Sequence, residues 1–155
     1  MLDLSLLKGN KMKTIPTIKM GAIPQQFGIN DTKDCAVRAL ANVSAFSYPE
    51  AHKLMADAGR KRNRGTPWPT LHSVYMATGA KEAAYYGSNT AIMACRFNAK
   101  HYNKSLTLKS FINQHPTGKY IVIVRGHALA VCDGAVIDLF ASKAGKRLMC
   151  VYKFD

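Results

Sequence analysis

A cysteine stands where a polar turn runs into an apolar helical segment. Residues 30–41 read NDTKDCAVRALA, so Cys35 falls in the first turn of the predicted helix. A thiol in that position lies beside unpaired backbone N–H groups and the positive end of the helix dipole, and both favour the thiolate. Three polar residues are candidates for the N-cap of this helix: Asp31, Thr32 and Asp34. Cys35 is therefore a candidate nucleophile, although a small buried side chain is the commoner role of a cysteine in such a helix.

A histidine and an aspartate occur far downstream, in two neighbouring segments rich in β-forming residues. The segments meet at Asp133-Gly134, a pair typical of a two-residue type I′ hairpin turn. If the residues that flank this turn pair with each other, His127 and Asp138 become diagonal neighbours on one face of the hairpin. Their Cβ atoms then lie roughly 7 Å apart or closer, within reach of a hydrogen bond between the side chains. The same register predicts that one face carries His127, Leu129, Val131, Val136, Asp138 and Phe140.

These residues together supply the parts of a thiol-dependent hydrolase. Cys35 is the nucleophile, His127 is the base, and Asp138 is the group that orients the base. A matched histidine and aspartate on one face of two apolar strands is hard to explain by packing alone. Three other polar residues remain alternatives to His127, in less suitable positions: His101, Asn103 and His115.

The order of these residues resembles that of the papain-like cysteine peptidase superfamily, in which a cysteine opens a buried central helix and a histidine and an Asp or Asn follow on strands. The strings DCAVRAL at 34–40 and GHALAV at 126–131 also resemble small bacteriophage proteins of that layout. The resemblance covers roughly residues 28 to 140. It implies a papain-like α+β fold, with the helix opened by Cys35 packed on a C-terminal antiparallel sheet. It also implies cleavage of a peptide or isopeptide amide in a peptide or protein substrate.

Two positions depart from the usual pattern of that family. Papain-like enzymes usually carry a Gln shortly before the cysteine, and its side chain helps the cysteine N–H to bind the oxyanion. Here Asn30 precedes Cys35 by five residues and is the expected donor, although an asparagine equally suits a turn. Alanine follows Cys35 where many relatives have glycine. A papain-like scaffold that has lost catalysis and serves as a basic binding module is therefore the second functional hypothesis.

The remaining pattern predicts one α+β domain over residues 28–155, preceded by an extended or loosely ordered basic arm at 1–27. A chain of 155 residues, 48% of them hydrophobic, is long enough for one sizeable core. Helices are predicted from Cys35 to about 45, from a Ser47/Glu50 capping box to Gly59, after Pro69, and after Thr107. Strands are predicted near 119–125, 127–132, 135–140 and 147–154, and the stretch 80–105 is predicted to be strand or loop.

The charge of the chain is strongly positive. There are 22 Lys and Arg residues against 9 Asp and Glu, a formal net charge of +13. Such an excess favours a polyanionic partner, whether nucleic acid, an acidic protein face or a membrane surface. The densest cluster of positive charge gives the candidate polyanion-binding residues: Arg60, Lys61, Arg62 and Arg64. The alternative interpretation of this cluster is a solvated loop. Trp68, which follows closely, suits either stacking on a base or capping the core.

The spacing of the cysteines and the lengths of the apolar runs indicate which cofactors and which cellular location to expect. The four cysteines lack metal-ligand spacing, so we expect reduced thiols, no metal and no cofactor: Cys35, Cys95, Cys132 and Cys150. No apolar run is long enough to cross a membrane, and we expect a cytoplasmic protein, located in the host cytoplasm or the virion if it is viral. An internal virion protein is the third functional hypothesis. The sequence does not indicate an oligomeric state.

Overall fold

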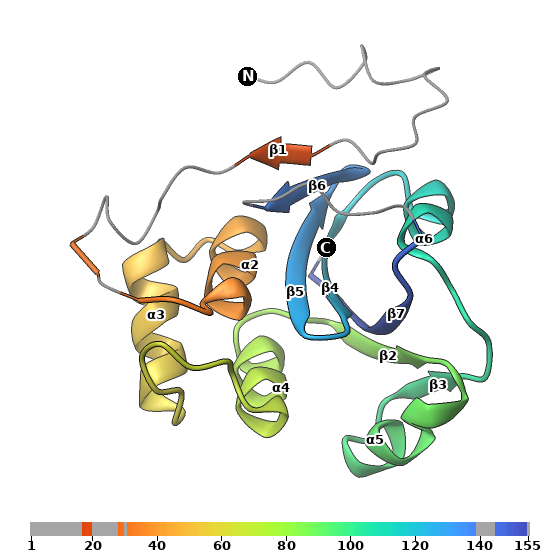
Figure 1. The fold of residues 1–155 in the computed structure, drawn as a ribbon, viewed down its shortest axis with the longest axis horizontal. Coiled ribbons are helices and arrows are strands. Elements are labelled where there is room, and N and C mark those ends of the chain that lie inside the picture. The colour runs from red at the N-terminus through yellow and green to blue at the C-terminus, as the bar shows by residue number, and fades with distance from the viewer. Residues whose placement is uncertain (1–16, 20–27, 30, 139–144, 155) are drawn as a thin grey trace.

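The computed structural model describes residues 17–19, 28–29, 31–138 and 145–154, the first of these as backbone. It has a mixed α+β fold in which helices precede most of the sheet (Figure 1). The helices are α2 (Cys35–Val43), α3 (Tyr48–Asp57), α4 (Trp68–Ala77), α5 (Ala91–Arg96) and α6 (Leu108–Gln114), with a 3₁₀ turn η2 (Ser88–Thr90). The strands are β1 (Thr17–Lys19), β2 (Glu82–Tyr86), β3 (Lys100–Tyr102), β4 (Lys119–Val124), β5 (His127–Cys132), β6 (Ala135–Asp138) and β7 (Leu148–Lys153).

Within the described residues the strands form one seven-stranded sheet in the order β1-β6-β5-β4-β7-β2-β3. Pairing is antiparallel from β6 across to β2, and parallel where β1 joins β6 and β3 joins β2. The last strand, β7, lies between β4 and β2, so both of its edges are hydrogen-bonded. The predicted α+β class is thus confirmed, with helices first and a mostly antiparallel sheet after them.

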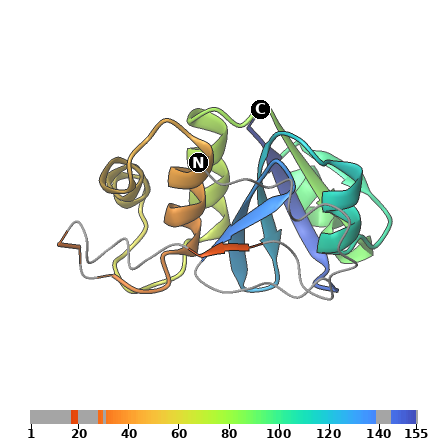
Figure 2. The ribbon, with the colours of Figure 1, turned by 90° about the horizontal axis from the view of Figure 1, so that it is seen from above.

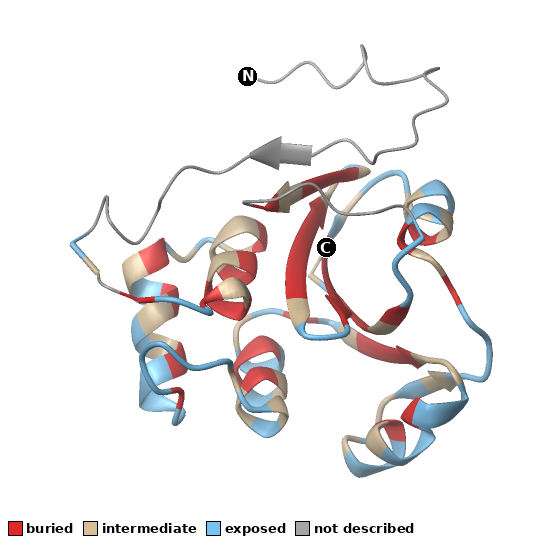
Figure 3. Ribbon diagram, in the orientation of Figure 1, coloured by how far each residue is buried: buried red, intermediate tan, exposed pale blue. Residues whose placement is uncertain are grey.

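Helices cover both faces of this sheet. The group α2, α3 and α4 lies along one face, and α6 lies against the other (Figure 2). Side chains alternate along β5, so Ala128 and Ala130 face α2 while Leu129 and Val131 face α6. Figure 3 shows the buried residues concentrated in α2 and the central strands, with α5 and β3 largely exposed.

The β5–β6 hairpin has the predicted turn and register. Asp133 and Gly134 both have positive φ, 48° and 79°, as the two central residues of a type I′ turn require. Cys132 pairs with Ala135 across the turn, and the ladder continues to Ala130 and Ile137. Leu129, Val131 and Val136 gather in one buried cluster, as predicted for that face. Phe140, predicted for the same face, lies outside the described residues.

Most predicted helices have local end signals that the structure confirms. The Ser47 hydroxyl accepts a hydrogen bond from the Glu50 N–H and the Glu50 side chain accepts one from the Ser47 N–H, so α3 begins with a capping box. Thr107 caps α6 in the same way through the Ser110 N–H. The first helix ends earlier than predicted, at Val43.

The prediction of strand or loop for residues 80–105 is wrong in one part. The two strands β2 and β3 are parallel neighbours, and parallel neighbours need a crossover connection of about a dozen residues. The crossover contains η2 and α5, a helix of 6 residues over 91–96. A helix this short has too few residues for a clear 3.6-residue pattern, so its origin lies in the topology of the sheet.

The predicted arm at residues 1–27 lies outside the described residues except for positions 17–19. These form β1, which runs parallel to β6 and pairs Lys19 with Asp138. In the described part of the chain, no helix has the length and apolar character needed to cross a membrane.

Candidate active site

Cys35 is the first residue of α2, as the sequence predicts. The helix packs closely on β5 because the residues that face each other are small, with Ala36 and Ala39 on the helix and Ala128 and Ala130 on the strand. The thiol is partly buried in this contact. Because it belongs to the first turn of α2, it lies where the unpaired N–H groups of the helix stabilise negative charge.

His127 and Asp138 lie together at the open end of the β5–β6 hairpin, away from its turn. His127 is the first residue of β5 and follows the turn Arg125-Gly126, while Asp138 is the last residue of β6. The imidazole Nε2 lies 2.5 Å from Asp138 Oδ2, so the diagonal contact expected from the register is present. The Asp138 side chain is 5% exposed and that of His127 is 26% exposed. The carboxylate is therefore shielded, and the ring still reaches solvent.

The imidazole also lies beside the thiol, and each group shifts the pKa of the other. The imidazole Nε2 faces Asp138, so Nδ1 is the ring nitrogen left for Cys35. Burial opposes ionisation of Cys35, but hydrogen bonds from His127 and the Ala128 N–H, with the charges of His127 and Arg38, hold the pKa of the thiol below its usual value. Hydrogen bonds to Asp138 and Cys35 raise the pKa of His127 to about 9, against the opposing effect of burial. Both shifts favour a thiolate beside an imidazolium.

Cys35 differs in this respect from the other partly or fully buried thiols. Burial raises the pKa of Cys132, and it raises the pKa of Cys150 to about 12. Cys95 is exposed on α5. The surroundings of Cys35 thus favour ionisation of its thiol, whereas burial opposes ionisation of Cys132 and Cys150 in the sheet.

The start of α2 is braced by a buried carboxylate. Asp34, the N-cap residue, accepts a hydrogen bond of 2.7 Å from the Tyr48 hydroxyl and pairs with Arg38 at 3.2 Å. Asp34 thus holds the N-cap position expected for it, although its side chain makes no capping hydrogen bond to α2. The same contact positions Arg38, whose charge helps to lower the pKa of Cys35. Tyr48 and Arg38 were not predicted, because neither carries a sequence signal that distinguishes it from an ordinary helical residue.

A second buried carboxylate fixes the turn before α2. Asp31 lies 2.7 and 3.1 Å from the two terminal nitrogens of Arg60, 2.7 Å from His52 Nε2 and 2.7 Å from the Asn63 N–H. Asp31 is thus no N-cap for α2. Thr32, the remaining candidate, bonds the Asn63 side chain through both its N–H and its hydroxyl. The network ties the turn that precedes Cys35 to the loop that follows α3.

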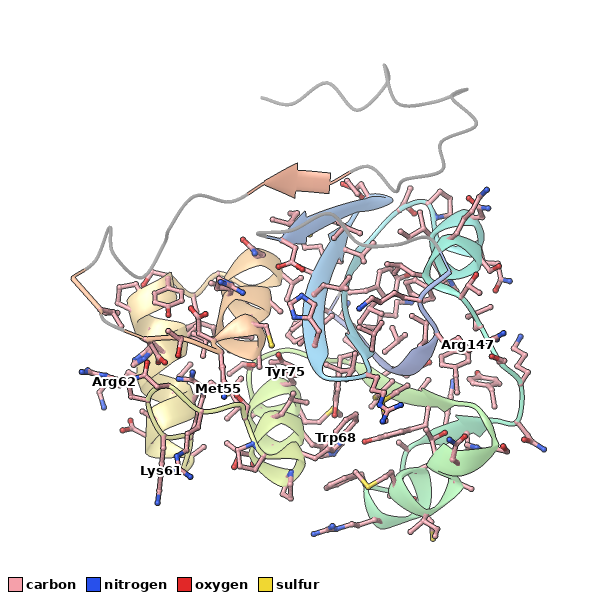
Figure 4. All side chains as sticks on the ribbon, in the orientation of Figure 1. Met55, Lys61, Arg62, Trp68, Tyr75 and Arg147 are labelled. Carbon is pink, nitrogen blue, oxygen red and sulfur yellow. The ribbon has the colours of Figure 1, made fainter. Side chains whose placement is uncertain are left out.

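This network corrects one predicted member of the polyanion-binding cluster. Arg60 is 4% exposed and its guanidinium is committed to Asp31, because a buried charge needs an opposite charge beside it. The other three members are exposed: Lys61, Arg62 and Arg64. Figure 4 shows Lys61 and Arg62 projecting from the helical side of the molecule. Trp68 is partly buried against the main core and donates a hydrogen bond of 2.6 Å to the Tyr85 hydroxyl, which is the core-capping role.

The structure does not place the remaining predicted site residues beside Cys35, His127 and Asp138. Asn30, the expected oxyanion donor, lies outside the described residues. His101 Nε2 lies 2.8 Å from the Gly87 carbonyl oxygen, and His115 Nδ1 lies 3.1 Å from that of Phe111. Both rings are therefore engaged by backbone. Residues 31–138 and 145–154 contain no group of three or more His, Cys, Asp or Glu side chains arranged to hold a metal.

Comparisons with models of known protein families, with curated proteins and with solved structures find no match to this chain. The arrangement of Cys35, His127 and Asp138 is therefore interpreted from its own geometry.

Proposed function

We propose that the protein is a thiol-dependent hydrolase of the papain-like kind, with Cys35 as nucleophile, His127 as base and Asp138 as the residue that orients His127. The observation that carries the proposal is the His127 imidazole, which is held by the buried Asp138 carboxylate and lies beside the Cys35 thiol so that each of the two shifts the pKa of the other. A nucleophile, a base and a group that fixes the base are the three parts that acyl-transfer chemistry needs.

In the proposed reaction the Cys35 thiolate attacks the carbonyl carbon of an amide, and the C=O electron pair moves to oxygen. The oxyanion is stabilised by the Cys35 N–H at the open start of α2, with Asn30 as the proposed second donor. When the intermediate collapses, the C–N bond breaks and the imidazolium of His127 gives its proton to the leaving amine. His127 then takes a proton from water, which attacks the thioester and releases the acid and Cys35.

The substrate class rests on the resemblance to papain-like peptidases. It supports a peptide or isopeptide amide in a peptide or protein substrate. The partly exposed ring of His127 supports a site that a chain can approach from solvent, because the imidazole must reach the leaving amine.

The first test is the pH dependence of alkylation by a haloacetamide, with the modified cysteine identified by mass spectrometry. We expect Cys35 to react well below pH 8, and the His127→Ala variant to lose this reactivity because the thiolate loses its main partner. The exposed Cys95 in the same molecule is an internal reference for an ordinary thiol.

Three results are informative. Fast Cys35 alkylation that depends on His127 supports the proposal and justifies a search for substrates. A Cys35 that reacts no faster than Cys95 contradicts it. Amide hydrolysis that survives Cys35→Ala in the folded protein also contradicts it.

A further inference from the structure

The outer strands β2 and β3 carry a pair of stacked tyrosines. Tyr86 and Tyr102 are register partners on these parallel strands, so their side chains emerge on the same face. The ring centroids are 5.2 Å apart and the planes are inclined by 21°. Tyr102 is 38% exposed, although most other large apolar side chains of the sheet are buried. α5 does not cover this face, because its Ala94 packs into the core on the α2 side.

Positive side chains surround the two rings. Lys104 places its Nζ 5.8 Å from the centroid of the Tyr102 ring. Lys100 precedes Tyr102 on the same face of β3, and Lys153 of β7 lies on that face opposite Glu82. Glu82 pairs with Lys100 at 3.3 Å, so among these residues one carboxylate is set against three lysines.

A fourth cation lies immediately before β7. Arg147 is exposed and hydrogen-bonds the hydroxyl of Ser105, which follows Lys104. Figure 4 places Arg147 on the side of the molecule that carries β3 and α6, away from Lys61 and Arg62 on the helical side. Among the described residues, the basic region with aromatic rings is thus separate from Lys61 and Arg62 and is not the one that the sequence singles out.

The tyrosine pair continues into a hollow between α6 and the sheet. Tyr86 lines a cavity of about 100 Å³, and the other walls include Ala84, Phe111, His115, Tyr120 and Lys153. The cavity therefore has an apolar floor with polar and charged groups around it.

We propose that Tyr86, Tyr102, Lys100, Lys104 and Lys153, together called the tyrosine platform, bind single-stranded nucleic acid. Aromatic rings on an open sheet stack with unpaired bases, and lysines around them neutralise phosphates. Both features are present here within one face of three adjacent strands. A duplex would contribute phosphates but no free base faces, so the platform selects single strands. The net charge of +13 supports capture of a polyanion by long-range attraction.

The test is binding of the full-length chain to fluorescent oligo(dT) and oligo(U) of about 15 nucleotides, followed by anisotropy. Tyr102→Ala removes an exposed ring and leaves the core intact, and we expect it to weaken binding about 5- to 150-fold. Tyr102→Phe is the matched control, because it keeps the ring and removes only the hydroxyl; its affinity should stay within about twofold of the wild type.

The charge contribution is tested separately through salt. The double variant Lys100→Ala/Lys104→Ala should lower the slope of log Kobs against log salt by about 1.4, since each phosphate contact to a single strand adds about 0.7. The variant Lys61→Ala/Arg62→Ala changes the other basic region. In that background, Tyr102→Ala should still lower the affinity for the oligonucleotide by the same factor as in the wild type. Cys35→Ala should bind as the wild type does, because the platform does not depend on the proposed hydrolase.

Some outcomes would overturn the proposal. These are unchanged affinity for the folded Tyr102→Ala variant, and a blunt duplex that binds as tightly as the single strand. A loss of binding confined to Lys61→Ala/Arg62→Ala would assign nucleic acid to the loop after α3 instead.

Discussion

The imidazole of His127 connects two acidic groups that act on it in the same direction. Asp138 holds a proton on Nε2, and the Cys35 thiolate favours a proton on the other nitrogen. The positive ring in turn favours ionisation of Cys35. Removing Asp138 should therefore alter both partners, although Asp138 lies on a different strand from His127.

The variant Asp138→Asn tests this coupling. We expect the pKa of His127 to fall from about 9 towards 6.5, and the onset of Cys35 alkylation to move to higher pH. The folded pKa of His127 lies above its unfolded value, so the stability it contributes is complete below about pH 6.5 and is lost as the pH rises through 9. The variant should thus lose more stability at pH 6 than at pH 10, as measured by urea unfolding. Equal losses at both pH values would argue against a charged His127–Asp138 pair.

The residue types and their spacing were enough to predict that the side chains of His127 and Asp138 meet. Strand alternation and a two-residue turn relate His127 to Asp138 over a short length of chain, so the contact follows from local rules. Arg60 could not be assigned in this way. Its partner Asp31 is distant in the sequence, and the five consecutive polar or charged residues 60–64 resemble a solvated loop until the fold buries one of them.

At the scale of elements, the turn Arg125-Gly126 determines where β5 begins and hence where His127 lies. Gly126 has a φ of 73°, and a Cβ built there meets no atom within 4 Å. The cost of a side chain at this position is therefore backbone strain alone.

The variant Gly126→Ala should lower the free energy of unfolding by about 1 kcal/mol, measured by urea denaturation. Gly65→Ala is a matched control, since Gly65 also has open space around it but no positive φ. That control should be neutral or slightly stabilising, because alanine restricts the unfolded chain. Equal destabilisation by both substitutions would show that the φ of Gly126 is not the cause.

The elements differ in how far the sequence predicts them. The starts of α3 and α6 follow from Ser47 and Thr107, because capping is decided within four residues. The position of β7 between β4 and β2 does not follow from any local pattern, since it depends on pairing with strands that are not its neighbours in sequence. The tyrosine platform has a different origin, because the crossover through α5 sets β3 parallel to β2, its predecessor in sequence.

At the scale of the whole molecule, the buried pair of Asp31 and Arg60 joins two loops that the helices alone would leave independent. Burial acts to raise the pKa of Asp31, but hydrogen bonds from Arg60, Asn63 and His52 hold it well below its usual range. The folded pKa is depressed, so the stability from Asp31 is present above about pH 4 and is lost as the pH falls below that value.

The variant Arg60→Met removes the guanidinium and leaves the Asp31 carboxylate without its main partner. We expect the free energy of unfolding at pH 7 to fall by about 3 to 5 kcal/mol, since a buried charge without its partner is costly. The control Arg62→Met changes an exposed member of the same loop and should alter stability by less than about 0.5 kcal/mol. Urea unfolding of both variants makes the comparison, and similar small losses would contradict a stabilising role for the pair.

The docking of α2 on β5 also determines when, during folding, Cys35 becomes reactive. The hairpin supplies the base and its carboxylate from adjacent strands, but the thiol arrives from a helix much earlier in the chain. Until that helix docks, Cys35 has neither the imidazole nor the Ala128 N–H beside it and remains an ordinary thiol. A nascent or misfolded chain therefore carries only an ordinary thiol at this position, and the activated nucleophile forms only once folding has brought both segments together.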